Sequence, residues 1–133
     1  SEALVIDKWF ALQAGASDRS GHILPIVRQL LLHPDFSIKN PNRARSLIFS
    51  YCSANPGAFH RLDAAGYVFW SDRVLEMDAL NPQVAARLAR ALDRWSRLAE
   101  PYRSAAKVAI ERVASKPDLS NDVREVVSRA LSQ

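Results

Sequence analysis

Three Asn-Pro pairs constrain the fold of this chain more than any other feature of its sequence. They stand at residues 40–41, 55–56 and 81–82, and each precedes a run of helix-forming residues. An asparagine side chain accepts a free backbone N–H at the start of a helix. Proline suits the first helical position, because the N–H that it lacks would have no partner there. The pairs therefore predict three helices that begin after residues 40, 55 and 81.

The same reasoning over the rest of the chain predicts an all-α fold of about eight short helices. Glycine is scarce, with four residues, and no stretch shows the sustained alternation of a strand. Short connections predict antiparallel neighbours. The length suits one domain or a piece of a larger protein, and we expect a single helical domain over residues 1–133. The predicted helices span residues 3–14, 22–32, 41–53, 56–62, 66–79, 82–98, 101–116 and 121–132.

Charge and cysteine content limit the partners and the compartment. The formal charge of +4, from 18 Lys and Arg against 14 Asp and Glu, permits an anionic partner without implying one. The single cysteine, Cys52, cannot form an internal disulfide, which favours a reducing compartment such as the cytoplasm. No apolar run approaches the roughly 20 residues that span a bilayer, so no membrane partner is expected. The chain starts within a predicted helix, which indicates an excised piece.

No motif in the sequence indicates a catalytic or metal centre. The three histidines and Cys52 match no zinc-site spacing, and neither a nucleophile elbow nor a glycine-rich phosphate loop occurs. Cys52 and His60 form the one conceivable thiol or zinc pair. Cys52, however, shares its predicted helix with the apolar Ile48 and Phe49, and a buried cysteine is usually inert. We therefore assign no catalytic residue, no metal ligand and no cofactor to this chain.

A basic stripe is predicted on the helix that spans residues 82–98. At about 100° per residue, its arginines fall within about 80° of one another and beside an apolar stripe that contains Leu88 and Trp95. The basic stripe is either a solvated face or a wall directed at a cavity or an anionic partner, and nucleic acid is the generic candidate. No helix-turn-helix signature and no interleaved aromatic residues support nucleic acid. The stripe consists of Arg87, Arg90, Arg94 and Arg97.

Arg45 has an unusual predicted position. The helical spacing places it near Ile48, Phe49 and Cys52, and away from the serines of the same helix, while Arg43 lies next to the serine side. An arginine among apolar neighbours is expected to be paired, to lie at an interface, or to point into a polar cavity. The alternative is an arginine whose stem packs on the protein while its guanidinium group reaches water.

Several strings of this sequence, in their order and spacing, resemble the C-terminal domain of bacterial aminopeptidase N, a zinc metallopeptidase of the gluzincin type. The resemblance extends from about residue 4 to the C-terminus and is strongest over residues 40–88. Residues 100–133 keep the helical pattern but carry no specific motif. The strings are VIDKWFALQA (residues 5–14), NPNRARSL (40–47), ANPGAFH (54–60), GYVF (66–69) and NPQVAARL (81–88).

The resemblance implies an armadillo- or HEAT-like superhelical stack and a role without catalysis. It implies that this domain covers the active-site chamber of a catalytic domain in the same polypeptide, where the zinc is bound and N-terminal amino acids are removed from peptides. By motif position, the resemblance implies that Arg45 and Arg87 line the chamber and bind peptide substrates. No nucleic-acid partner is then expected. The alternative is a basic helical module that binds nucleic acid or a protein partner through Arg90, Arg94 and Arg97.

Overall fold

The computed structural model describes residues 1–133, which form helices joined by turns and loops. The chain divides into two compact units, Ser1–Phe59 and His60–Gln133. The all-α prediction is confirmed, because every regular element is helical. None of the helices combines the length and the apolar character that crossing a membrane would require.

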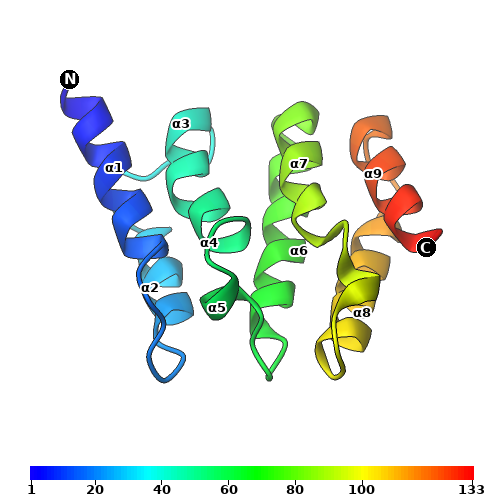
Figure 1. Ribbon diagram of the computed structural model, residues 1–133. Helices are drawn as coiled ribbons and strands as arrows, with labels where there is room; N and C mark the ends of the chain where they lie inside the picture. Colours follow the sequence, from blue (N-terminus) through cyan, green and yellow to red (C-terminus); the bar gives the residue numbers. More distant parts are fainter. The chain divides into compact units, whose positions relative to one another are not determined.

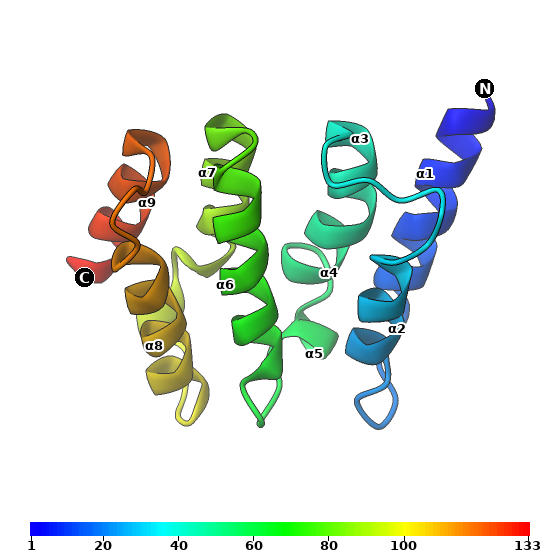
Figure 2. The same ribbon diagram turned by 180° about the vertical axis from the view of Figure 1, so that it is seen from behind.

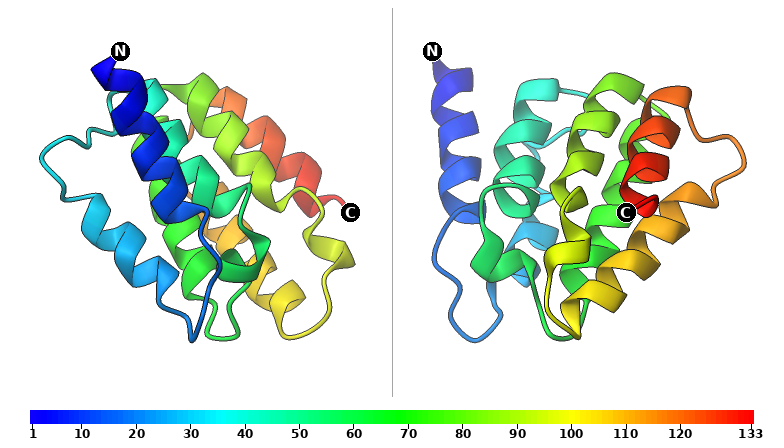
Figure 3. Two further views of the ribbon diagram at one scale, coloured as in Figure 1. Left: turned by 60° about the vertical axis from the view of Figure 1, so that its left-hand side comes forward. Right: turned by 45° about the vertical axis from the view of Figure 1, so that its right-hand side comes forward.

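The first unit contains three long helical segments and one short helix. Its elements are α1 (Glu2–Ala14), α2 (Ile23–Leu30), α3 (Pro41–Ala44), η1 (Arg45–Phe49), α4 (Ser50–Cys52) and α5 (Pro56–Phe59). α3, η1 and α4 follow one another without a break, and η1 is a π-helical segment within this longer helix. α1, α2 and the α3–α4 helix alternate in direction, as expected for antiparallel neighbours (Figure 1). The connection from α2 to α3, residues 31–40, is longer than predicted (Figure 3).

Apolar side chains of all three segments are buried in this unit. Phe10 of α1, Val27 of α2, and Leu47 and Ile48 of η1 are fully buried. The Phe10 ring also meets Phe36 edge-on, with ring centroids 5.9 Å apart, and so fixes part of the long connection. Such burial of one face of each helix is the main source of stability for short helices, which are marginal on their own.

The second unit consists of two antiparallel helical pairs. Its elements are α6 (Ala65–Asp78), α7 (Pro82–Ala89), η2 (Arg90–Leu92), η3 (Trp95–Arg97), α8 (Tyr102–Ala114) and α9 (Asn121–Leu131). α6 pairs with α7, and α8 with α9 (Figures 1 and 2). The indole Nε1 of Trp70 donates to the Leu88 carbonyl at 2.9 Å and joins α6 to α7. The Ser120 N–H donates to the Asp78 carboxylate at 2.9 Å and joins α9 to the end of α6.

The prediction of one helix over residues 82–98 is wrong. α7 ends at Ala89, and the chain continues through the 3₁₀ turns η2 and η3. The break directs Trp95 toward α9, where its Nε1 donates to the Ala130 carbonyl at 2.9 Å. The Asp93 carbonyl accepts from Gln133 Nε2 at 2.7 Å instead of from the next helical turn. Partners more than 30 residues away thus end the helix, and local periodicity carries no trace of them.

The helix predicted over residues 56–62 is also too long. α5 covers only Pro56–Phe59. The hydroxyl of Tyr51 donates to the Ala58 carbonyl at 2.8 Å, which is the acceptor that a longer helix would use for its next turn. The remaining predicted helices agree with the structure to within one or two residues at each end, which is the usual uncertainty of helix boundaries.

Candidate functional site

The first turn of α3 positions Arg45. The side-chain oxygen of Asn40 accepts the N–H groups of Asn42 at 3.1 Å and of Arg43 at 3.2 Å, so Asn40 caps the helix as predicted. Pro41 occupies the first helical position. Arg45 follows one turn later and is exposed. Its Nη2 donates to Oδ1 of Asn42 at 2.6 Å. The guanidinium group of Arg45 is therefore held by a neutral amide at the protein surface.

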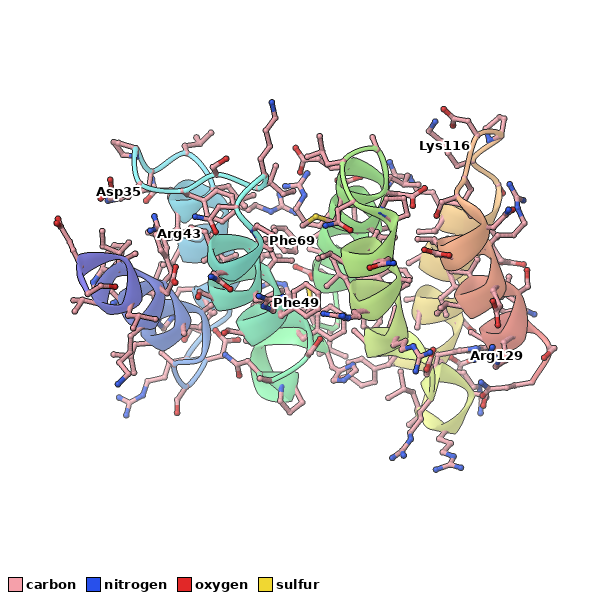
Figure 4. All side chains as sticks on the ribbon, turned by 90° about the horizontal axis from the view of Figure 1, so that it is seen from above. Asp35, Arg43, Phe49, Phe69, Lys116 and Arg129 are labelled. Carbon is pink, nitrogen blue, oxygen red and sulfur yellow. The ribbon has the colours of Figure 1, made fainter.

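Arg43, two positions earlier, has the opposite environment. Its Nε donates to the Asp7 carboxylate at 2.6 Å, and the two side chains are only 11% and 14% exposed. Its Nη1 also donates to the backbone carbonyl of Asp35. Figure 4 labels Arg43 and Asp35 near α1 and α3. The charge of Arg43 is thus neutralised within the fold, whereas no carboxylate pairs with Arg45.

Of the two environments predicted for Arg45, the structure agrees with the one in which the guanidinium group reaches water. Its side chain is exposed rather than enclosed by Ile48, Phe49 and Cys52. The π-helical segment begins at Arg45, whose carbonyl accepts the N–H of Ser50 five residues later. A wider turn changes the angle per residue, so the assumption of 100° per residue fails here. π-Helical turns are frequent at functional sites.

Arg87 lies on α7 in the second unit. The helix begins as predicted, because Oδ1 of Asn81 accepts the Val84 N–H at 3.2 Å and Pro82 follows. Val84 and Leu88 are buried, while Arg87 is exposed and forms no hydrogen bond or ion pair. Arg45 and Arg87 therefore belong to different units. That the two guanidinium groups line one shared wall stays a prediction.

The other arginines of the predicted stripe are also exposed and unpaired, but they do not lie on one straight helix. Arg90 is in η2, Arg94 lies in the turn after it, and Arg97 is in η3. The only acid between residues 87 and 97 is Asp93. Burial raises the pKa of the Asp93 carboxyl, while Arg90, Arg129 and Arg94 oppose that shift. The segment thus carries a net positive charge at the surface.

Cys52 and His60, the candidate thiol and histidine, are both held within the fold. Cys52 is buried, 4% exposed, as expected for an inert thiol. His60 Nδ1 lies 2.6 Å from the hydroxyl of Tyr67. Burial lowers the pKa of His60, and burial also raises the pKa of Tyr67 to about 12. Both groups are therefore neutral at pH 7. No group of three or more His, Cys, Asp or Glu residues is arranged to hold a metal ion.

Sequence reasoning missed Asn42. Its amide oxygen accepts a hydrogen bond from the guanidinium group of Arg45, three residues later. This spacing brings side chains together on one helical face. The asparagine and arginine spacing in NPNRAR was therefore a visible signal. Asn40 and Asn81 of the Asn-Pro pairs instead accept backbone N–H groups at the starts of their helices.

Comparisons with known proteins agree with the resemblance seen in the sequence. Residues 1–132 match a family model described as "Domain of unknown function (DUF3458_C) ARM repeats". Aminopeptidase N of Caulobacter vibrioides is 41% identical over 131 residues, 98% of this chain and 15% of that protein. Aminopeptidase N of Haemophilus influenzae is 42% identical over 98% of this chain, and that of Escherichia coli is 40% identical over 97%.

A solved structure is similar as well. The crystal structure of Legionella pneumophila aminopeptidase A in complex with aspartic acid superposes with a TM-score of 0.90 at 27% identity. The match covers 99% of this chain and 15% of that chain. This chain thus spans about 15% of the length of the curated relatives and of the solved structure.

Proposed function

This chain belongs to the DUF3458_C family of ARM-repeat domains, and from that premise we propose that it is the C-terminal, non-catalytic domain of a zinc aminopeptidase. The proposed role is to cover the active-site chamber of the catalytic domain in the same polypeptide and to supply arginines that admit and dock peptide substrates. The enzyme would remove N-terminal amino acids from peptides in the cytoplasm. The relatives support the proposal, because this chain matches 15% of their length at about 40% identity.

The zinc ion of such an enzyme would be held by residues outside this chain. No cluster of His, Cys, Asp or Glu here has the ligand number that zinc requires. The proposal therefore includes no chemical step for these 133 residues, and their contribution is substrate binding.

The single observation that carries the docking role is the environment of Arg45. Its guanidinium group is exposed and bound only to the neutral amide of Asn42. A peptide has a C-terminal carboxylate, which an arginine binds through two parallel hydrogen bonds. Arg43 in the same motif is neutralised by Asp7 and cannot take this role without breaking that pair. Arg87 is likewise exposed and free of ion pairs, which supports a role for both arginines.

The test is the substitution of each arginine in the full-length polypeptide. A hydrogen bond to a charged group contributes about 1.5–3 kcal/mol, so Arg45→Ala or Arg87→Ala is expected to raise KM for tripeptides about tenfold or more. The kcat values should stay unchanged, because the lost contact is made equally in the ground state and the transition state. Small chromogenic amino-acid amides lack the peptide carboxylate, and their KM should not change.

Two controls separate docking from general damage. Arg28→Ala removes another exposed arginine, on α2, and is expected to leave KM unchanged for all substrates. Peptides with an amidated C-terminus should show no difference between wild type and Arg45→Ala. Equal effects of Arg45→Ala on peptides and on small amides would exclude the docking role.

A second candidate function is a basic helical module that binds nucleic acid or a protein partner. The exposed and unpaired Arg90, Arg94 and Arg97 favour it. Binding through phosphate contacts weakens steeply with salt. A gel shift with RNA or DNA at low salt that disappears in the triple alanine variant would support this function. Absence of binding at low salt would exclude it for nucleic acid.

A further inference from the structure

We propose that Asn42 is a positioning residue for Arg45: its amide oxygen orients the guanidinium group toward a substrate carboxylate without neutralising it. This inference rests on the proposed function, because it assigns Arg45 the docking role. It adds a residue that binds no substrate itself and acts through its neighbour.

Hydrogen bonds to its backbone hold Asn42 in place independently of Arg45. The Asn42 N–H donates to Asn40 Oδ1 at 3.1 Å, and its carbonyl accepts from Ser46 Oγ at 2.8 Å. The Asn42 carbonyl also accepts the backbone N–H of Arg45 at the end of α3. With its backbone held at both ends, Asn42 directs its side-chain oxygen to Arg45 Nη2 at 2.6 Å. One turn of helix thus supplies a fixed acceptor to a flexible side chain.

The chemistry of the acceptor decides what remains available on Arg45. A guanidinium group has five N–H donors, and Asn42 accepts from one nitrogen. Nη2 keeps its second N–H group, which together with the parallel N–H of Nε or of Nη1 can still form a two-point contact with a carboxylate. The amide carries no charge, so the attraction between Arg45 and an anion is undiminished. Arg43 in the same unit differs, because its charge is compensated by an ion pair with Asp7.

The tether also reduces the cost of binding. An exposed arginine samples many rotamers, and ordering such a side chain on binding costs about 0.5–1.5 kcal/mol. The bond to Asn42 restricts the Arg45 rotamers before the substrate arrives. Loss of that bond is therefore expected to weaken binding of the carboxylate while the chemistry continues at its normal rate.

The experiment compares two variants of Asn42 in the full-length polypeptide. Asn42→Ala removes the tether and is expected to raise KM for tripeptides about two- to tenfold with unchanged kcat. Asn42→Asp is nearly isosteric but places a competing carboxylate on Arg45, so its KM should approach that of Arg45→Ala. Neither variant should alter KM for amidated peptides or small chromogenic amides. A merely structural role for Asn42 would not produce this split between substrates.

Two comparisons complete the test. Asn121→Ala, which changes an exposed asparagine in the first turn of α9, should leave every KM unchanged. In an Arg45→Ala background, Asn42→Ala and Asn42→Asp should have no further effect, and melting temperatures should confirm that all variants fold. If Arg45→Ala raises KM while both Asn42 variants behave as wild type, the positioning role is overturned and the proposed function stands. If Arg45→Ala has no effect on peptide KM, the docking role of Arg45 fails, and this inference with it.

Discussion

At the residue scale, Arg43 and Arg45 show how two identical side chains acquire different uses. Arg43 is mostly buried, and its partner Asp7 comes from α1, which lies 36 residues earlier in the sequence. Arg45 is exposed, and its partner Asn42 lies in the preceding turn. Removing one member of a mostly buried ion pair leaves an uncompensated charge in a poorly solvated place. An exposed side chain bound to a neighbouring amide has little influence on stability.

We therefore predict different stability effects for the two alanine variants. Arg43→Ala should lower the free energy of unfolding by about 2 kcal/mol, because the Asp7 carboxylate loses its charged partner. Arg45→Ala should change it by less than about 0.5 kcal/mol. Urea unfolding of the chain, followed by circular dichroism, measures both. Asp7→Ala combined with Arg43→Ala should cost less than the sum of the two single changes. Equal effects of the two arginine variants would contradict the assigned pairing.

At the element scale, the three Asn-Pro pairs begin three helices but use their asparagines in two ways. The side chains of Asn40 and Asn81 accept backbone N–H groups as N-caps. The side chain of Asn55 is buried instead, and its Nδ2 donates to the carbonyls of Ala14 and Ala16, both at 2.8 Å. Carbonyl groups at the end of α1 have no partner within their helix. Asn55 satisfies them and ties the end of α1 to the start of α5.

Aspartate substitutions distinguish the two uses. Asn81→Asp should be tolerated to within about 0.5 kcal/mol, because aspartate is as good an N-cap as asparagine. Asn55→Asp should destabilise the chain by about 2 kcal/mol or more, because a carboxylate cannot donate to the carbonyls of Ala14 and Ala16. Thermal and urea unfolding at pH 7 provide the measurement. A tolerated Asn55→Asp would show that the amide hydrogens of Asn55 have no role.

At the scale of the whole molecule, one cluster of unpaired arginines and one exposed apolar helix face lie in different units. The unpaired arginines between residues 87 and 97 belong to the second unit, whereas α1 of the first unit exposes large apolar side chains. At about 100° per residue, the exposed apolar side chains of α1 fall within an arc of about 140° around the helix axis. A groove of about 320 Å³ adjoins them, lined in part by Trp9 and His33. This apolar face of α1 consists of Leu4, Val5, Trp9 and Leu12, which are 40–68% exposed.

The isolated chain should therefore self-associate as its concentration rises. Exposed contiguous apolar patches favour association in water. The double variant Leu4→Glu with Leu12→Glu should shift the population toward monomer in sedimentation velocity experiments, with little change in melting temperature. Leu62→Glu, which alters an exposed leucine of the second unit, is the matched control and should have no effect. A wild-type chain that stays monomeric at several hundred micromolar would refute this prediction.

Part of the candidate site could be predicted from local sequence, and part could not. The motif NPNRARSL indicated both a helix start and the position of Arg45, and Asn42 was visible at a spacing of three residues. The sequence did not decide between the two environments predicted for Arg45, because the π-helical segment that begins there departs from the assumed angle per residue. The prediction of a continuous basic stripe over residues 87–97 was wrong for a similar reason, because the helix that begins at Pro82 ends at Ala89.

The helical class and the starts at Pro41, Pro56 and Pro82 were determined by the sequence alone, because caps and prolines act within about four residues of their own position. Only the tertiary structure decided which arginine of residues 40–47 is paired with a carboxylate, because Asp7 is supplied by a distant helix. It likewise decided where the helix after Asn81 stops, because Trp95 finds its acceptor at Ala130. Such partners become neighbours only after the helices have packed together.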